Sequence, residues 1–305
     1  MSTFRRIDLP GSAPEDVAVL PDGRIGTGLS DGRLLAVDPE SGTVDVIADT
    51  AGRLLGLDAR SDGSIVLCDH DRGLLILDAG KQRAEVLADT VDGRPLHFAS
   101  NAVTASDGSV YFSSSSQRFT IDRWRADLIE HSGTGRLMRR HPDGTVDVLR
   151  GGLQFANGVV LAPDETFVLV AETGAARISR LWLSGARAGD WDVFADDLPG
   201  YPDNMSVGSD GRVWVALASP RNSVLEALFK LPLRARKVLA RAPERVGPAP
   251  EETLWAIGLT FDGAVEREVR LDDVDFSFAT SVVERDGVLY LGTIAHDALA
   301  VVNLD

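Results

Sequence analysis

The feature that most constrains the fold of this chain is a repeated alternation of short apolar runs with Asp-Gly turns. Asp-Gly is a strong hairpin signal, because glycine readily takes the positive φ that such turns need. The runs between the turns are rich in Val, Leu and Ile. The sequence therefore predicts a mostly β chain. Asp-Gly pairs begin at Asp22, Asp31, Asp62, Asp92, Asp107, Asp143, Asp210, Asp262 and Asp286.

The predicted strands group into units of four that repeat about every 40 to 55 residues, which is typical of a β-propeller. Six units begin at residues 15, 54, 101, 157, 203 and 254. We expect the sixth to be split, with runs at 254–261 and 265–271 ahead of 278–302. A β-sandwich would also contain many short strands, but it would not require this repeat. The prediction is an all-β, six-bladed propeller of four-stranded blades with a central metal site, forming one domain over residues 1–305.

Two insertions interrupt the repeat. Residues 117–132 separate two strands of the third unit and are expected to fold as a lid or helix. Residues 219–250 are less strand-like; within and beside them, Ser223–Lys230 is a candidate short helix and Pro243–Glu252 a candidate loop. In a propeller, such insertions shape the pocket at the mouth of the channel and so set its specificity. The substrate itself stays open.

The composition excludes several classes of function. A formal net charge of -15 with a pI near 4.7 argues against a nucleic-acid partner, which needs clustered Lys and Arg. No run approaches the roughly 18 apolar residues of a membrane span, and the single cysteine, Cys68, is expected to be a small core residue. We expect a cytoplasmic protein with a small-molecule substrate, no nucleic-acid or membrane partner, and a monomeric or small homo-oligomeric state.

Polar residues recur at one place in the repeat. Glu15, Asn157 and Asp203 each lie seven residues before the aspartate of their unit's first turn, and Asn101 and Asn204 lie six before it. The innermost strand of each blade runs along the channel, so a shared offset places side chains at one height around the axis. The corresponding positions are Leu55 and Gly56 in the second unit and Ala279 and Thr280 in the sixth. The sequence therefore predicts a lopsided ring of oxygen ligands.

Two carboxylates and three amides that converge on one point repel one another or stay unpaired unless a cation or water satisfies them. Each residue alone is as readily explained by a turn or a solvated charge, but their common offset favours a shared site. Oxygen ligands without Cys or His suit a hard cation, and a loose set of oxygens suits Ca²⁺ better than Mg²⁺. We predict a calcium site, with another divalent cation as the alternative, formed by Glu15, Asn101, Asn157, Asp203 and Asn204.

Several segments resemble a known superfamily over nearly the whole chain. They include Pro14-Glu-Asp-Val17, Gly152-Leu-Gln-Phe-Ala-Asn-Gly158 and Leu198-Pro-Gly-Tyr-Pro-Asp-Asn204. The chain resembles the calcium-dependent six-bladed propellers of the strictosidine synthase-like, gluconolactonase and paraoxonase superfamily, nearest to the strictosidine synthase-like branch. The resemblance implies that Glu15, Asn101, Asn157 and Asp203 match calcium ligands of the hydrolytic members. It implies that Asn204 matches an additional amide of paraoxonase-like sites.

The chain departs from this superfamily at two catalytic positions. Strictosidine synthases condense an amine with an aldehyde using a glutamate of the last blade, where this chain has Thr280, and Glu284 lies nearer the turn. The paraoxonase histidine of the second blade has no counterpart in Gly52-Arg-Leu-Leu-Gly-Leu57. Both departures disfavour a direct transfer of either mechanism.

These observations favour a metal-dependent hydrolase of a lactone or related ester, in which the cation polarises the carbonyl. Asp203 is the catalytic candidate, as base, nucleophile or ligand only, and His97 is a weaker one because it precedes Asn101 by four residues. A condensing enzyme or lyase and a non-catalytic, metal-stabilised binding propeller remain as alternatives. The candidate pocket residues are Leu55, Phe119, His131, Tyr201, Thr280 and His296.

Overall fold

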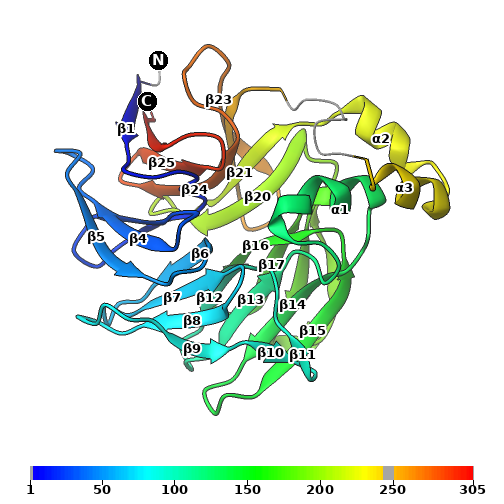
Figure 1. The fold of residues 1–305 in the computed structure, drawn as a ribbon, viewed down its shortest axis with the longest axis horizontal. Coiled ribbons are helices and arrows are strands. Elements are labelled where there is room, and N and C mark those ends of the chain that lie inside the picture. Colours follow the sequence, from blue (N-terminus) through cyan, green and yellow to red (C-terminus); the bar gives the residue numbers. More distant parts are fainter. Residues whose placement is uncertain (1–2, 243–250, 305) are drawn as a thin grey trace.

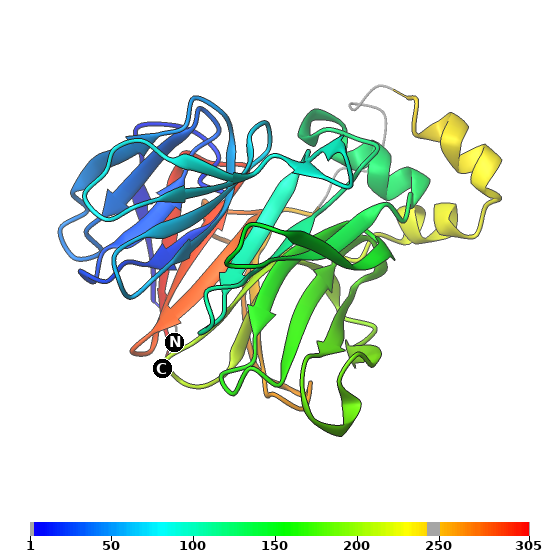
Figure 2. The same ribbon diagram turned by 90° about the horizontal axis from the view of Figure 1, so that it is seen from below.

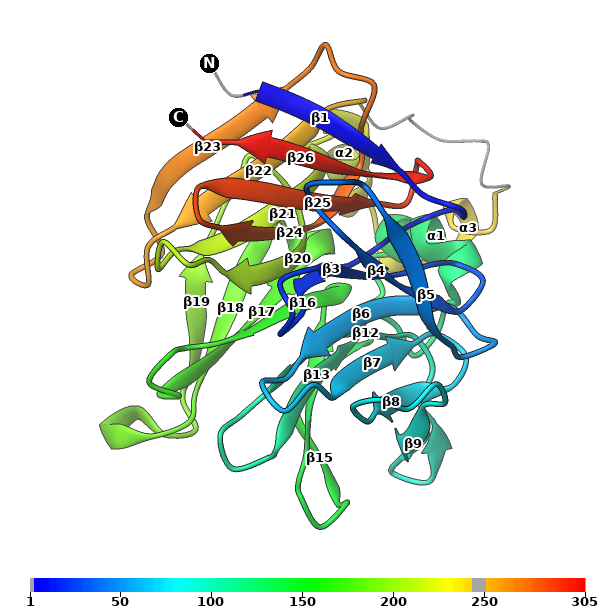
Figure 3. The same cartoon turned by 90° about the vertical axis from the view of Figure 1, so that its left-hand side faces the viewer.

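The computed structural model describes residues 3–242 and 251–304, and it contains six four-stranded antiparallel sheets around a common axis (Figure 1, Figure 3). The first blade consists of β2 (Val17–Val19), β3 (Ile25–Gly28), β4 (Arg33–Val37) and β5 (Val44–Asp49). The second consists of β6 (Leu54–Ala59), β7 (Ile65–Asp69), β8 (Gly73–Leu77) and β9 (Glu85–Ala88). The third consists of β12 (Ala99–Thr104), β13 (Val110–Ser114), β14 (Gly135–Arg140) and β15 (Val146–Leu153).

The other three blades follow the same order. The fourth consists of β16 (Ala156–Leu161), β17 (Phe167–Glu172), β18 (Arg177–Trp182) and β19 (Trp191–Ala195). The fifth consists of β20 (Gly200–Val207), β21 (Val213–Pro220), β22 (Leu254–Leu259) and β23 (Val265–Leu271). The sixth consists of β24 (Ala279–Arg285), β25 (Val288–Thr293), β26 (Ala298–Asn303) and β1 (Thr3–Asp8). The innermost strands contact one another around a closed ring, which confirms the predicted six-bladed propeller.

The predicted division between the last two units is wrong. The runs at 254–261 and 265–271 supply the two outer strands of the fifth blade, so the insertion after β21 lies within that blade. The sixth blade obtains its outer strand from the other end of the chain, because β1 pairs with β26 from Thr3↔Asn303 to Asp8↔Ala298 (Figure 3). Because β1 is far in sequence from the other strands of the sixth blade, no local turn signal predicts this pairing.

The core lies between neighbouring blades. Inner and middle strands such as β3, β7 and β13 are buried along their whole length, since each sheet packs on both faces. The largest fully buried side chain is Trp214 of β21, which packs against apolar residues of the sixth blade. Cys68 is fully buried in the core, as predicted.

Each innermost strand from the second to the sixth blade carries a β-bulge at one height. The register with the next strand shifts between Leu54 and Gly56, Ala99 and Ala102, Ala156 and Val159, Pro202 and Met205, and Ala279 and Ser281. A bulge breaks the alternation of a strand and re-aims side chains. The residues at these bulges include Asn101, Asn157, Asp203, Asn204 and Thr280, which the sequence placed at one level.

Four short helical segments, which we call the cap, cover one end of the channel (Figure 1, Figure 2). They are η1 (Ile121–Arg123), α1 (Trp124–Glu130), α2 (Ser223–Phe229) and α3 (Leu233–Leu239). The helix predicted in residues 117–132 and the helix predicted at Ser223–Lys230 are confirmed, whereas α3 had no sequence prediction. The cap is joined by hydrogen bonds from Arg236 Nη1 to Glu130 O and from Arg123 Nη2 to Ala240 O, both 2.7 Å long.

The remaining elements are small. They are β10 (Thr90–Val91) and β11 (Arg94–Pro95), which form a two-stranded sheet, with η2 (Thr173–Ala175) and η3 (Gly185–Arg187). Of the predicted loop at Pro243–Glu252, residues 243–250 lie outside the described residues. Within 3–242 and 251–304, no helix has the length and apolarity needed to cross a bilayer.

Candidate active site

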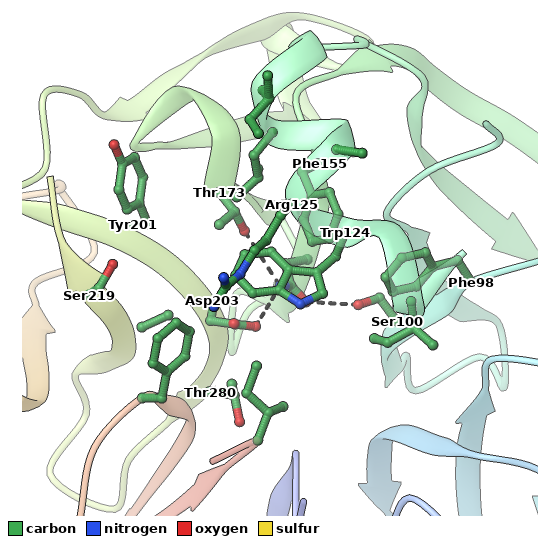
Figure 4. A pocket seen from close by; sticks show the side chains of 18 of the residues that line it. Phe98, Ser100, Trp124, Arg125, Phe155, Thr173, Tyr201, Asp203, Ser219 and Thr280 are labelled. Carbon is green, nitrogen blue, oxygen red and sulfur yellow. Dashed lines mark hydrogen bonds between the residues drawn. The ribbon is translucent and has the colours of Figure 1, made fainter. Parts of the chain in front are cut away.

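A cavity of about 430 Å³ lies between the cap and the ends of the inner strands (Figure 4). Its walls are largely aromatic and aliphatic. Trp124 of α1 packs edge-on against Phe278 with ring centroids 6.2 Å apart, and Phe98 packs against Phe155 at 5.5 Å. The apolar walls therefore come from the cap on one side and from segments flanking the inner strands on the other. The apolar lining includes Phe98, Ile121, Trp124, Leu128, Ile129, Phe155, Tyr201, Leu225, Phe278 and Ile294.

The polar end of this cavity, which we call the pocket floor, consists of Glu15, Asn157, Asp203 and Thr280. All four are buried, yet all line the cavity. Asn157 Nδ2 donates a hydrogen bond to Asp203 Oδ1, and Asn157 Oδ1 accepts one from Ser100 Oγ at 2.8 Å. Thr280 Oγ1 donates to the Glu15 carbonyl oxygen at 2.7 Å. Four blades thus contribute to one polar surface, as the common offset predicted.

Burial sets the charge of the pocket floor. It raises the pKa of Glu15 to about 8, an effect that Arg53 partly offsets and Asp16 reinforces. Burial also raises the pKa of Asp203 well above its usual range, and the charges of Glu15 and Asp16 add to the increase. Both carboxyls favour the protonated form when nothing positive lies between them.

Three polar atoms next to the axis have no partner. Glu15 Oε2 and both side-chain atoms of Asn204, Oδ1 and Nδ2, are buried and make no hydrogen bond to the described residues. Asn204 is 1% exposed. Buried polar groups are almost always paired, so unpartnered atoms of this kind fit a site that binds an ion or a polar ligand. The donor set, two carboxylates and two amides, is suited to a hard cation.

Asn101 lies apart from the pocket floor. Its Nδ2 donates to Asp16 Oδ2 at 3.0 Å, and its Oδ1 accepts from Val159 N at 2.8 Å. It lines a second cavity, at the opposite end of the channel. Its amide oxygen therefore already accepts a hydrogen bond, and Asn101 does not line the pocket that Glu15, Asn157 and Asp203 share.

Asp16 is the buried acid that the sequence reasoning passed over. Its carboxylate accepts hydrogen bonds from Val17 N, Leu57 N, Asn101 Nδ2 and Ser281 Oγ. These contacts tie together the inner strands of four blades, between the two cavities. Burial nevertheless raises its pKa to about 6. Its position beside Glu15 in Pro14-Glu-Asp-Val17 was the signal that could have identified it.

Close approach of the inner strands depends on glycine at Gly158. A Cβ at this position would lie 2.6 Å from Met205 N and 2.7 Å from Asp203 O, both backbone atoms of the adjacent blade. Contacts this short do not occur, so only glycine lets β16 and β20 meet here. The distance between the Asn157 and Asp203 side chains follows from this approach.

The structure places two of the six predicted pocket residues on the cavity, Tyr201 and Thr280. The other four do not line it. Leu55 is buried in the apolar cluster that includes the wall residues Phe98 and Phe155, and Phe119 lies beside Arg118. His131 ends α1 and packs on Phe229, with ring centroids 4.3 Å apart, and burial lowers its pKa to about 4. His296 stacks on Phe276 and accepts a hydrogen bond from Ser277 N.

His97 is wrong as a catalytic candidate. Its side chain is exposed, and it does not line the cavity. The neighbouring residue Phe98, which has a positive φ, lines the pocket instead. Of the two predicted catalytic residues, Asp203 therefore lines the pocket and His97 does not.

Glu284 lies where the sequence suggested, away from the pocket. Its carboxylate accepts hydrogen bonds from Ser209 Oγ, Asp210 N and Gly287 N, and it lines the second cavity. Thr280 occupies the sixth blade's place on the pocket floor. No glutamate of the last blade therefore faces the pocket in the described structure.

Arg53, Trp124 and Arg125 line the cavity and were missed by the sequence reasoning. Trp124 and Arg125 come from α1, and Figure 4 shows both side chains in the pocket with Asp203 and Thr173. Nothing in their local sequence distinguishes a lid residue from a solvated helix residue. Arg53 directly precedes the innermost strand of the second blade, in the segment that lacks a counterpart of the paraoxonase histidine.

Comparison with known proteins identifies the family. The Strictosidine synthase family model matches residues 100–186, and the Strictosidine synthase-like, N-terminal model matches residues 1–37. Protein STRICTOSIDINE SYNTHASE-LIKE 10 of Arabidopsis thaliana is 36% identical over 237 residues, covering 72% of this chain and 61% of that protein. Adipocyte plasma membrane-associated protein of Rattus norvegicus is 33% identical over 211 residues, covering 67% of this chain and 56% of that protein. The matches thus span little more than half of these relatives.

Solved structures agree in fold at low sequence identity. A gluconolactonase from Xanthomonas campestris superimposes with a TM-score of 0.72 at 18% identity, covering 100% of this chain and 90% of that one. A calcium-binding protein, regucalcin, from Agrobacterium tumefaciens gives 0.65 at 15% identity, covering 99% and 95%. At these identities the likeness concerns the propeller alone. The family models and the relatives show that the chain, a six-bladed propeller, belongs to the strictosidine synthase-like family.

Proposed function

We propose that this protein is a calcium-dependent hydrolase of a lactone or related ester. The observation that carries the proposal is the unpartnered buried oxygen Glu15 Oε2 on the same pocket floor as the carboxylate of Asp203, at the polar end of an apolar pocket. Asn204, which follows Asp203 in the chain, adds a second unpartnered buried oxygen, its Oδ1. A carboxylate pair whose pKa values are raised by burial is stabilised in its ionised form by a divalent cation.

Glu15, Asn157, Asp203 and Asn204 would hold the cation. Asn157 would contribute its Oδ1 only if that atom gave up the hydrogen bond from Ser100 Oγ. Asn101 joins them only if its amide leaves Asp16 and Val159 N. When bound, Ca²⁺ supplies Lewis acidity that polarises an ester carbonyl and offsets the charge of the oxyanion. Part of the ligand shell has to stay open to substrate, which fits a site with few protein oxygens.

The other steps belong to the chain's own residues. Asp203 in its ionised form accepts a proton from the attacking water, whose oxygen bonds to the carbonyl carbon, and the departing alkoxide takes that proton as the C–O bond breaks. Asn157 orients Asp203 through their hydrogen bond. Trp124, Phe98 and Phe155 hold the apolar part of the substrate and exclude water from its other bonds.

The proposal is tested by removing and returning the metal. The purified protein is analysed for bound metal, treated with EDTA, and assayed on gluconolactone, alkyl lactones and phenyl acetate before and after addition of Ca²⁺. We expect chelation to abolish hydrolysis and calcium to restore it, with a calcium-dependent rise in melting temperature as a readout that needs no substrate. Hydrolysis that is indifferent to both treatments would contradict the proposal.

A strictosidine synthase-like condensation is the second candidate, because the chain belongs to that branch. Thr280 on the pocket floor and Glu284 in the other cavity weigh against it. Incubation with tryptamine and an aldehyde, followed by mass analysis of products, separates condensation from hydrolysis. The non-catalytic alternative predicts calcium binding with no turnover of any substrate in either assay.

A further inference from the structure

Arg53 is the one residue of the second blade whose side chain lines the pocket described above. It directly precedes β6, and its backbone is fixed there by a hydrogen bond from His70 N to Arg53 O at 2.8 Å. Its Nε is buried and has no partner. Within 3–242 and 251–304, no carboxylate forms an ion pair with its guanidinium.

A guanidinium N–H that is buried without an acceptor is unusual, because a donor that leaves water without gaining a partner is destabilising. Arg53 as a whole is only partly buried, so the unpartnered Nε is the exception within its side chain. Glu15 is near enough for Arg53 to lower its pKa by charge, but the two side chains form no ion pair. The planar guanidinium matches a carboxylate or another planar oxyanion in two parallel hydrogen bonds. Arg53 therefore has the chemistry of an anion-binding group without its anion.

The charge of the whole pocket points in the same direction. The ionisable groups that line it are Glu15, Asp122 and Asp203 on the acidic side and Arg53 and Arg125 on the basic side. If Glu15 and Asp203 hold a divalent cation, as the proposed function requires, their two charges are neutralised. The cationic side chain of Arg53 then remains at the pocket without an ion-pair partner among the described residues, although the chain as a whole has a net charge of -15.

We infer that Arg53 forms an anion subsite, and that the substrate is an ester or lactone with an apolar body and a carboxylate. The carboxylate is held by Arg53 while the apolar body lies against Trp124, Phe98 and Phe155. A neutral polyol lactone such as gluconolactone would leave Arg53 unpaired and place hydroxyls against aromatic walls, so we expect it to be a poor substrate. This inference rests on the proposed hydrolase function.

Two probes with the same scissile bond test the subsite. They are 4-acetoxybenzoate, which is anionic at neutral pH, and its neutral methyl ester, assayed with the calcium-loaded protein. We expect wild-type kcat/KM to favour the anion by about tenfold or more, the range of a charged hydrogen bond. Arg53→Met should lower kcat/KM for the anion, mainly through KM, by about 10- to 100-fold more than it lowers kcat/KM for the neutral ester. Arg53→Lys should recover part of the loss, and the exposed Arg83→Met is the matched control.

A binding arm separates failure of the subsite from failure of the hydrolase proposal. Calorimetry compares 4-biphenylacetate with 4-biphenylacetamide, neither of which contains an ester, and metal content is measured for each variant. A carboxylate preference that disappears in Arg53→Met supports the subsite even if no ester is hydrolysed. Equal affinity of the wild-type protein for the two probes overturns the proposed subsite. So does a carboxylate preference that survives in Arg53→Met, which would show that the metal alone holds the anion.

Discussion

Asn157 Nδ2, in the innermost strand of the fourth blade, donates a hydrogen bond to Asp203 Oδ1 in that of the fifth. Glu15 reaches the same pocket floor from the first blade. The pocket floor is thus assembled from strands that are distant in sequence, and its charge is a property of the closed ring. The predictions below follow from the charge, spacing and walls of this assembly.

Asp203→Asn removes one of the two carboxylates that the proposed cation requires. We expect the variant to lose calcium binding by calorimetry and to hydrolyse ester substrates about a hundredfold more slowly or worse. In EDTA its melting temperature should equal or exceed that of wild type, because a neutral amide replaces a carboxyl whose ionised form burial disfavours. The exposed Asp78→Asn is the control, with wild-type behaviour expected in all three measurements. Wild-type calcium affinity in Asp203→Asn would contradict the assigned role.

Gly158→Ala should destabilise the propeller at its axis. The added Cβ would meet the backbone of Met205 and Asp203 at 2.6 and 2.7 Å, and neither strand can yield locally. We expect a loss of about 1–3 kcal/mol in the free energy of unfolding, measured in urea, with a weaker response to calcium. Gly151→Ala is the matched control, because a Cβ there has no neighbour within 4 Å. Equal stability of the two variants would refute the close-approach argument.

The metal-free protein should lose stability as the pH rises from about 5 to about 8. The pKa of Glu15 is raised from 4.5 to about 8 on folding, so between these values the native state binds more protons than the unfolded state. The free energy of unfolding then decreases with increasing pH, and this contribution is complete only below the unfolded pKa. Asp16, with a pKa raised to about 6, acts in the same direction.

Thermal unfolding in EDTA at several pH values measures this slope. Glu15→Gln removes a titrating group and should flatten the upper part of the curve, between about pH 6 and 8, while Asp16 still acts below it. Saturating calcium should also reduce the slope, because a bound cation keeps the carboxylates deprotonated. Stability that increases with pH across this range would show that these carboxyls are ionised in the metal-free native state.

Trp124→Ala should change substrate binding more than catalysis. Trp124 forms the cap side of the pocket and touches Phe278, but it makes no contact that positions Asp203. We expect KM for apolar aryl esters to rise about tenfold or more, with a smaller change in kcat and an unchanged calcium affinity. Trp191→Ala, at a tryptophan outside the cavity, controls for a general loss of stability. A variant that loses kcat alone would place Trp124 in the chemistry.

The sequence by itself determined the repeat and the level of the polar residues. Turn signals are local, so Asp-Gly pairs in the first three blades and the Pro163-Asp164 turn in the fourth indicated their hairpins, and the offset from each unit's first turn placed Glu15, Asn157 and Asp203 on one floor. Closeness in sequence to Asn101 did not place His97, which is exposed while the adjacent Phe98 lines the pocket.

Only the tertiary structure decided the closing strand pair of the sixth blade and the contacts and charges at the axis. The β1–β26 pairing joins residues almost 300 positions apart, and no local pattern specifies it. Asn101 shares the turn offset of the other ligands, yet its amide bonds to Asp16 because the closed ring brings that carboxylate within 3.0 Å. Burial and nearby acidic side chains raise the pKa values of Glu15 and Asp203. Burial also leaves the Nε of Arg53 without a hydrogen-bond partner. Charge and chemistry at the axis depend on distances that exist only once the ring has closed.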